Sequence, residues 1–134
     1  MVKKTDREIV EQIDQAFAEL IVSLKDLARS VQPENLIRSA AAIEQMCGGL
    51  TANLWDDPFE WTLPETLSNA DRVVEYLSEV DLARERAFEA MDDGALTKYV
   101  SVPSGESKLL ISLLLETLVR ASEFLGRASV PKNV

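Results

Sequence analysis

The stretch that decides the fold is residues 5–31, which read TDREIVEQIDQAFAELIVSLKDLARSV. Apolar side chains recur there every three or four positions, at Ile9, Ile13, Phe17, Leu20, Leu24, Leu27 and Val31. This spacing places them on one face of an α-helix, and the face is widened by Val10, Ile21 and Ala28. Thr5 or Asp6 can cap the helix, and Pro33 ends the pattern.

Three further segments carry the same helical periodicity. They span residues 34–54, 69–91 and 106–128, and residues 129–134 form a loose tail. Ser68 with Asp71 resembles a capping box at the start of the third helix. Four amphipathic helices of this length predict an all-α, antiparallel four-helix bundle with long crossover connections. The 134 residues suit a single domain, residues 1–134.

Two connections are too long to be simple turns. Residues 55–67 contain Trp55 and Trp61, which we expect to anchor that segment on the bundle. Between residues 92 and 105, Tyr99, Val100 and Val102 could form a short extended piece, but no sheet is predicted.

Composition excludes several classes of activity. The chain has no histidine, which rules out a Ser-His-Asp triad, a Cys-His pair and any His-dependent metal centre. Its net charge of -9 argues against nucleic acid and against an anionic membrane as partners. The start of the chain does not resemble a signal peptide, and a single cysteine is typical of a reducing compartment. We therefore expect a cytoplasmic protein.

A few residues could carry chemistry, and each also has a structural interpretation. Cys47 lies on the apolar face of the second helix, where a thiol is usually a small core residue. Asp81 and Arg84 are three residues apart and could pair, or could line a pocket.

Glu116, Arg120 and Glu123 have the spacing of an ion-pair ladder along one helix face. The alternative is a polar patch inside a pocket, where Arg120 would bind a carboxylate or a phosphate. A metal would need several inward-facing carboxylates, for which the candidates are Glu44, Asp81, Glu116 and Glu123. The simpler expectation is no metal and no cofactor.

The C-terminal half contains a diffuse set of motifs. They are Pro64-Glu65-Thr66-Leu67, the run from Val73 to Asp81 with Ala83-Arg84, the step Val102-Pro103-Ser104-Gly105-Glu106, and Leu113 to Leu118 with Gly126. With these segments the chain resembles the DinB-like (DinB/YfiT) superfamily of bacterial four-helix bundles.

The resemblance implies a four-helix bundle that tends to dimerise, with a pocket at the family's metal site. That site uses one histidine from the second helix and two from the last. In this chain the last two positions fall at Arg120 and Phe124, and the first falls near Glu44 to Cys47. None of them is histidine, so the metal and the thiol-transferase or hydrolase activity of some relatives are not implied.

These observations together predict a non-catalytic, metal-free homodimer that binds a small ligand or a protein partner between the second, third and fourth helices. The residues predicted to form this pocket are Arg120, Glu116, Phe124, Glu123, Cys47, Glu44, Asp81, Arg84, Trp55 and Trp61. Two alternatives stay open. One is an enzyme with a carboxylate-bound metal, and the other is an acidic adaptor or chaperone-like bundle that works through an exposed apolar face.

Overall fold

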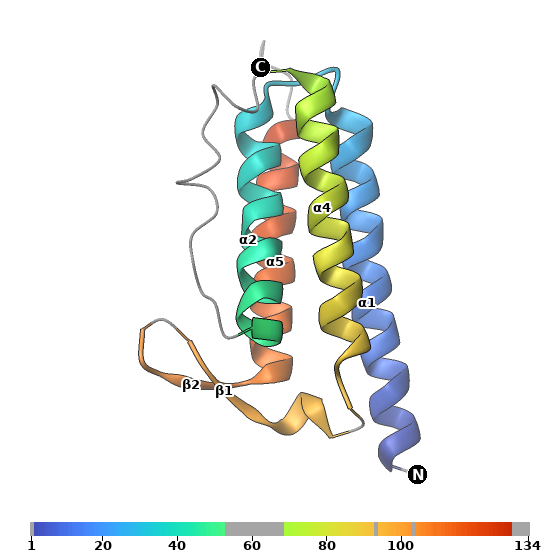
Figure 1. Cartoon of the computed structure of the whole chain (residues 1–134), viewed down its shortest axis with the longest axis vertical. Coiled ribbons are helices and arrows are strands. Elements are labelled where there is room, and N and C mark those ends of the chain that lie inside the picture. The colour runs from blue at the N-terminus through green and yellow to red at the C-terminus, as the bar shows by residue number, and fades with distance from the viewer. Residues whose placement is uncertain (1, 53–68, 93, 103, 130–134) are drawn as a thin grey trace.

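The computed structural model describes residues 2–52, 69–92, 94–102 and 104–129. Four long helices dominate this part of the chain: α1 (Val2–Leu27), α2 (Pro33–Ala52), α4 (Ala70–Glu89) and α5 (Leu110–Ser129) (Figure 1). They share one cluster of buried side chains. The predicted all-α four-helix bundle is confirmed.

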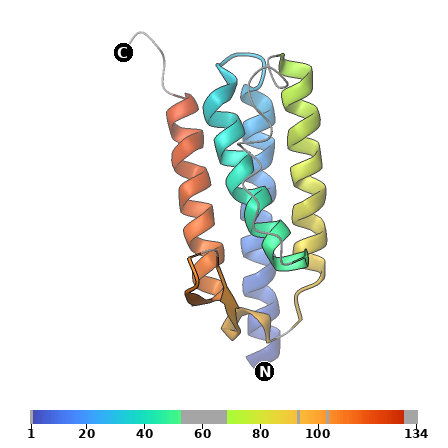
Figure 2. The ribbon, with the colours of Figure 1, turned by 60° about the vertical axis from the view of Figure 1, so that its left-hand side comes forward.

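The helices form a ring in the order α1, α4, α2, α5, because α2 packs against α4 and α5, and α1 packs against the same two helices from the other side. Figure 2 shows α2 in front of α1, with α5 and α4 to either side. Helices α1 and α5 run in one direction and α2 and α4 in the other (Figure 1). Helix α2 therefore ends at the opposite end of the bundle from the start of α4. The predicted crossover between them lies outside the described residues.

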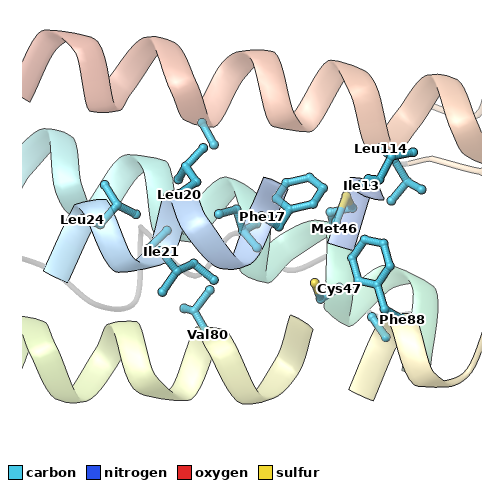
Figure 3. Packing of buried hydrophobic residues seen from close by; sticks show 14 of the residues in the cluster. Ile13, Phe17, Leu20, Ile21, Leu24, Met46, Cys47, Val80, Phe88 and Leu114 are labelled. Atoms are coloured by element: carbon cyan, nitrogen blue, oxygen red, sulfur yellow. The ribbon is translucent and has the colours of Figure 1, made fainter. Parts of the chain in front are cut away.

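The core follows from the apolar stripe of α1. Phe17 and Leu24 are completely buried, and the flanking positions Val10, Ile13, Leu20 and Ile21 are buried with them. The Phe17 ring lies 5.9 Å from the Phe88 ring of α4, measured between centroids, and Met46 and Cys47 of α2 lie close by (Figure 3). The stripe therefore faces the centre of the ring, where the other helices meet it.

The helix ends differ in detail from the predictions. Helix α1 already includes Thr5 and Asp6, so neither residue caps it, and it ends at Leu27 in a turn closed by Ser30 N–H donating to Leu27 O. Proline at the first position of α2 suits a helix start, because that backbone nitrogen needs no partner. The N-cap of α4 is Asn69, whose side chain accepts a hydrogen bond from Arg72 N–H at 2.9 Å. Ser68 lies outside the described residues.

The connection before α5 contains a β-hairpin, so the prediction of no sheet was wrong. Strand β1 (Tyr99–Ser101) pairs antiparallel with β2 (Ser107–Leu109), with Val100 opposite Lys108. The loop between them closes through Gly105, whose φ of 88° lies in the region that favours glycine. Because residues 107–109 join this ladder, α5 begins at Leu110 and not at residue 106.

A short 3-10 helix, η1 (Ala95–Thr97), precedes the hairpin and packs against α5. Its residues Ala95 and Leu96 are buried and belong to the same core cluster as the long helices. Leu110 N–H donates a hydrogen bond to Lys98 O at 2.8 Å, which ties the start of α5 to the segment that enters the hairpin. The hairpin is thereby fixed at one end of the bundle.

Replacing Phe17 by alanine should lower the free energy of unfolding by about 3–5 kcal/mol, because it removes a fully buried ring and leaves a cavity between α1 and α4. Urea titration followed by circular dichroism measures the change. The matched control is Val22→Ala on the same helix, where the side chain is 56% exposed and the expected change is within about 0.5 kcal/mol. Equal losses for the two variants would contradict this assignment of the core face.

Candidate functional site

Arg84 of α4 is the most deeply buried charged side chain among the described residues, with only 9% of it exposed. Its Nε donates a hydrogen bond to Asp81 Oδ1 at 2.9 Å, and its Nη1 donates to Asp14 Oδ1 of α1. Burial lowers the pKa of Arg84, but its hydrogen bonds to the two carboxylates and their negative charges outweigh burial and raise the pKa overall. The predicted Asp81–Arg84 pair is confirmed.

Asp14 was missing from the predicted set, although the sequence held a signal for it. It stands four residues after Val10 and three before Phe17, so it lies at the edge of the buried face. A carboxylate in that position is half-buried and needs a cation on the neighbouring helix. Arg84 therefore cross-links α1 and α4.

Glu44 of α2 lies against α4 through a different contact. Tyr76 Oη donates a hydrogen bond to Glu44 Oε1 at 2.7 Å. Burial raises the pKa of Glu44, the hydrogen bond from Tyr76 partly opposes that, and the nearby charge of Glu79 raises it further. Glu44 is thus held as a partner of Tyr76.

Cys47, one turn further along α2, is completely buried. Burial raises the pKa of its thiol to about 12, although the positive charge of Arg84 acts in the opposite direction. The nucleophilic form of cysteine is the thiolate, so at neutral pH this thiol is unreactive. The prediction that Cys47 is a core residue is confirmed.

A pocket of about 330 Å³ lies between α2, α5 and the hairpin. This volume falls in the range of small-molecule sites. The pocket is lined by Ala42, Gln45, Met46, Val102, Ser104, Lys108, Leu113, Glu116, Thr117 and Arg120. The predicted pocket residues Glu116 and Arg120 are among them, but the third wall is the hairpin, and none of these lining residues comes from α4.

The predicted ladder of Glu116, Arg120 and Glu123 does not form among the described residues. Glu116 pairs instead with Lys108 of β2, whose Nζ donates to Glu116 Oε1 at 2.7 Å. The hairpin places Lys108 beside the first turns of α5, where it pairs with the carboxylate of Glu116 that was predicted to pair with Arg120. Within the part of the chain that the structure describes, exposed Arg120 forms no ion pair and lines the pocket.

Glu116 and Arg120 also border a shallower groove on the outer side of α5. That groove is completed by Leu115, Val119 and Glu123. Leu115 is 45% exposed and Val119 is 58% exposed, and the two lie one helical turn apart, so they form a small apolar strip on the surface of α5. The two charged residues therefore form a rim between a polar pocket and an apolar groove.

The remaining predicted site residues that the structure describes do not line this pocket. Phe124 is half-buried further along α5, and the guanidinium of Arg127 lies 5.3 Å from its ring centroid. Trp55 and Trp61 lie outside the described residues. The carboxylates considered for a metal site do not converge, and no group of three acidic, cysteine or histidine side chains in the described ranges could hold a metal ion.

The chain was compared with protein-family models, curated proteins and solved structures. No protein-family model, no curated protein and no solved structure matches it. None of the described helices is both long and apolar enough to cross a membrane.

Glu44→Gln should raise the free energy of unfolding at pH 7 relative to the wild type. The folded-state pKa of Glu44 is raised above its ordinary value of 4.5, so the folded state binds the proton more tightly than the unfolded state. Ionisation of Glu44 therefore destabilises the fold as the pH rises through that window, and glutamine removes this effect while it can still accept from Tyr76. The difference between the variants, measured by urea titration from pH 4 to pH 7, should vanish toward pH 4.

The thiol of Cys47 should resist modification in the folded protein. With Ellman's reagent at pH 8 we expect a rate at least about a hundredfold below that of the chain in denaturing urea, because the thiol is both buried and protonated. Fast reaction without denaturant would show that α2 opens readily at this position.

Proposed function

We propose that this chain is a non-catalytic binding protein that takes a small anion in the pocket between α2, α5 and the hairpin. The observation that carries the proposal is Arg120, an arginine without an ion-pair partner in the described residues that lines a pocket of ligand size. Guanidinium groups bind carboxylate and phosphate through paired charge-assisted hydrogen bonds. A lysine, a glutamine, a serine and a threonine among the lining residues supply further donors.

The other charged groups of the interior support a binding role over a catalytic one. Arg84 is held by Asp14 and Asp81, and Glu44 is held by Tyr76. A nucleophile needs an adjacent base or a depressed pKa, whereas the pKa of Cys47 is raised. The groups that could react are thus engaged in holding helices together.

The resemblance to the DinB-like superfamily suggests how such a site could have arisen, and we include it in the proposal. On this view the chain is a metal-free, cytoplasmic member of that superfamily, with Arg120 at one of the positions of the family's metal-binding histidines. A homodimer formed through the outer face of α5 is the corresponding proposal for its assembly.

A second candidate function is that of an adaptor for another protein. It is favoured by the groove along α5, where Leu115 and Val119 are exposed between charged residues. Light scattering separates the two uses of this face. A dimer would cover Leu115 and Val119, whereas a monomer would leave them open to a partner.

Arg120→Ala should abolish the stabilisation of the protein by its anionic ligands, because it removes the unpaired guanidinium of the pocket. The test is a thermal-shift screen with small carboxylates, phosphate and sulfate, followed by isothermal titration calorimetry. Arg127→Ala is the matched control, since Arg127 is also an exposed arginine of α5 but lies over Phe124 and outside the pocket lining. Identical responses of the two variants to every anion would refute the proposed pocket.

A further inference from the structure

The pocket between α2, α5 and the hairpin has an apolar wall and a charged rim. Met46 of α2 and Leu113 of α5 are buried residues that line it, and Ala42 and Val102 add to the apolar wall. The rim carries Lys108, Glu116 and Arg120, of which the last two are one helical turn apart on α5. A ligand that fills this space needs an apolar body and one charged end.

The charges of the rim determine how much negative charge that end should carry. Lys108 and Arg120 contribute two positive charges and Glu116 contributes one negative charge, which leaves a single positive charge. A monoanion neutralises it. A phosphate dianion would leave excess negative charge on a chain whose net charge is already -9. The rim therefore favours a carboxylate over a phosphate ester or a nucleotide.

The Lys108–Glu116 ion pair gives the ligand a second contact. The lysine side chain is 32% exposed and the glutamate 53% exposed, and ion pairs this accessible to water contribute little to stability. An incoming carboxylate can therefore replace Glu116 as the partner of Lys108 at small cost. Its other oxygen can accept from Arg120, which has no ion pair to break among the described residues.

We propose that the ligand is a monocarboxylate with a short unbranched alkyl chain. Its carboxylate lies between Arg120 and Lys108 and displaces Glu116, and its alkyl chain lies against Met46 and Leu113. This inference rests on the proposed function and names the ligand class of that same site.

The first experiment compares probes on the unaltered chain by isothermal titration calorimetry. Hexanoate should bind at least about tenfold more tightly than acetate, because each methylene removed from water strengthens binding by up to about fourfold. Inorganic phosphate should bind more weakly than hexanoate. Hexylamine and 1-hexanol, which carry the same alkyl chain without the negative charge, should show no saturable binding.

The second experiment uses three variants, each directed at one part of the site. Arg120→Ala should abolish hexanoate binding. Glu116→Gln should tighten it by about threefold, because Lys108 is then free of its competing carboxylate. Ala42→Leu fills the apolar part of the pocket, so it should weaken hexanoate at least about tenfold while it leaves acetate unchanged. Circular dichroism confirms that each variant folds.

The outcomes separate this inference from the proposed function. Saturable binding of phosphate that is lost in Arg120→Ala, without preferred binding of hexanoate, would overturn the ligand class and leave the anion pocket standing. Hexanoate binding that is the same in all three variants would overturn the placement of the ligand. Failure of every anion to bind would overturn both proposals.

Discussion

The arrangement of the bundle depends on the requirement that Arg84 be paired. The fold places this guanidinium where 9% of the side chain is exposed, and a buried charge without a partner costs several kcal/mol. Asp81 lies on the same helix as Arg84, so their contact does not restrict how α4 is positioned against its neighbouring helices. Asp14 comes from α1, so its contact with Arg84 favours the axial position of α1 against α4 that the structure shows.

The same kind of contact recurs at two other helix pairs. Tyr76 of α4 donates to Glu44 of α2, and Ser39 Oγ of α2 donates to the carbonyl oxygen of Ala121 in α5 at 2.8 Å. Apolar side chains such as leucines can repack after a small slide between helices, whereas a buried hydroxyl or carboxyl that loses its partner is penalised at once. These polar contacts join α1 to α4, α4 to α2, and α2 to α5. We infer that they set the register in which α2 and α5 form two walls of the pocket.

The sequence predicted the elements whose signal is local. The apolar stripe of α1 repeats every three or four residues, so its buried face could be predicted without knowledge of the neighbouring helices. Phe17 and Leu24 are buried, as predicted. The pairing of Asp81 with Arg84 was equally local. The hairpin was missed because each of its strands has three residues, too few for an alternating pattern to stand out from the start of a helix.

That single omission also affected the prediction of the site. With residues 106–109 assigned to a helix, Lys108 would lie about two helical turns from Glu116. The cation expected to pair with Glu116 was therefore Arg120, four residues further along the helix. The hairpin supplies the third wall of the pocket. It also provides Lys108, which pairs with Glu116 in place of Arg120. A contact between a strand and a helix that are adjacent in the chain depends on where the turn falls, and Gly105 with its positive φ is the residue that places it.

The proposed ligand is an anion and the chain is acidic, so the proposal has to account for both the distant and the local charges. The net charge of -9 acts over the whole surface, but salt screens it beyond a Debye length of about 8 Å at physiological ionic strength. At contact distance the nearest groups decide, and there Lys108 and Arg120 outnumber Glu116. The distant negative charge repels every anion in proportion to the anion's charge. The single net positive charge of the rim is neutralised by the first negative charge of a ligand and attracts no second one. The proposed preference for a small monoanion over a highly charged polymer such as nucleic acid follows from this difference in range between the two charge effects.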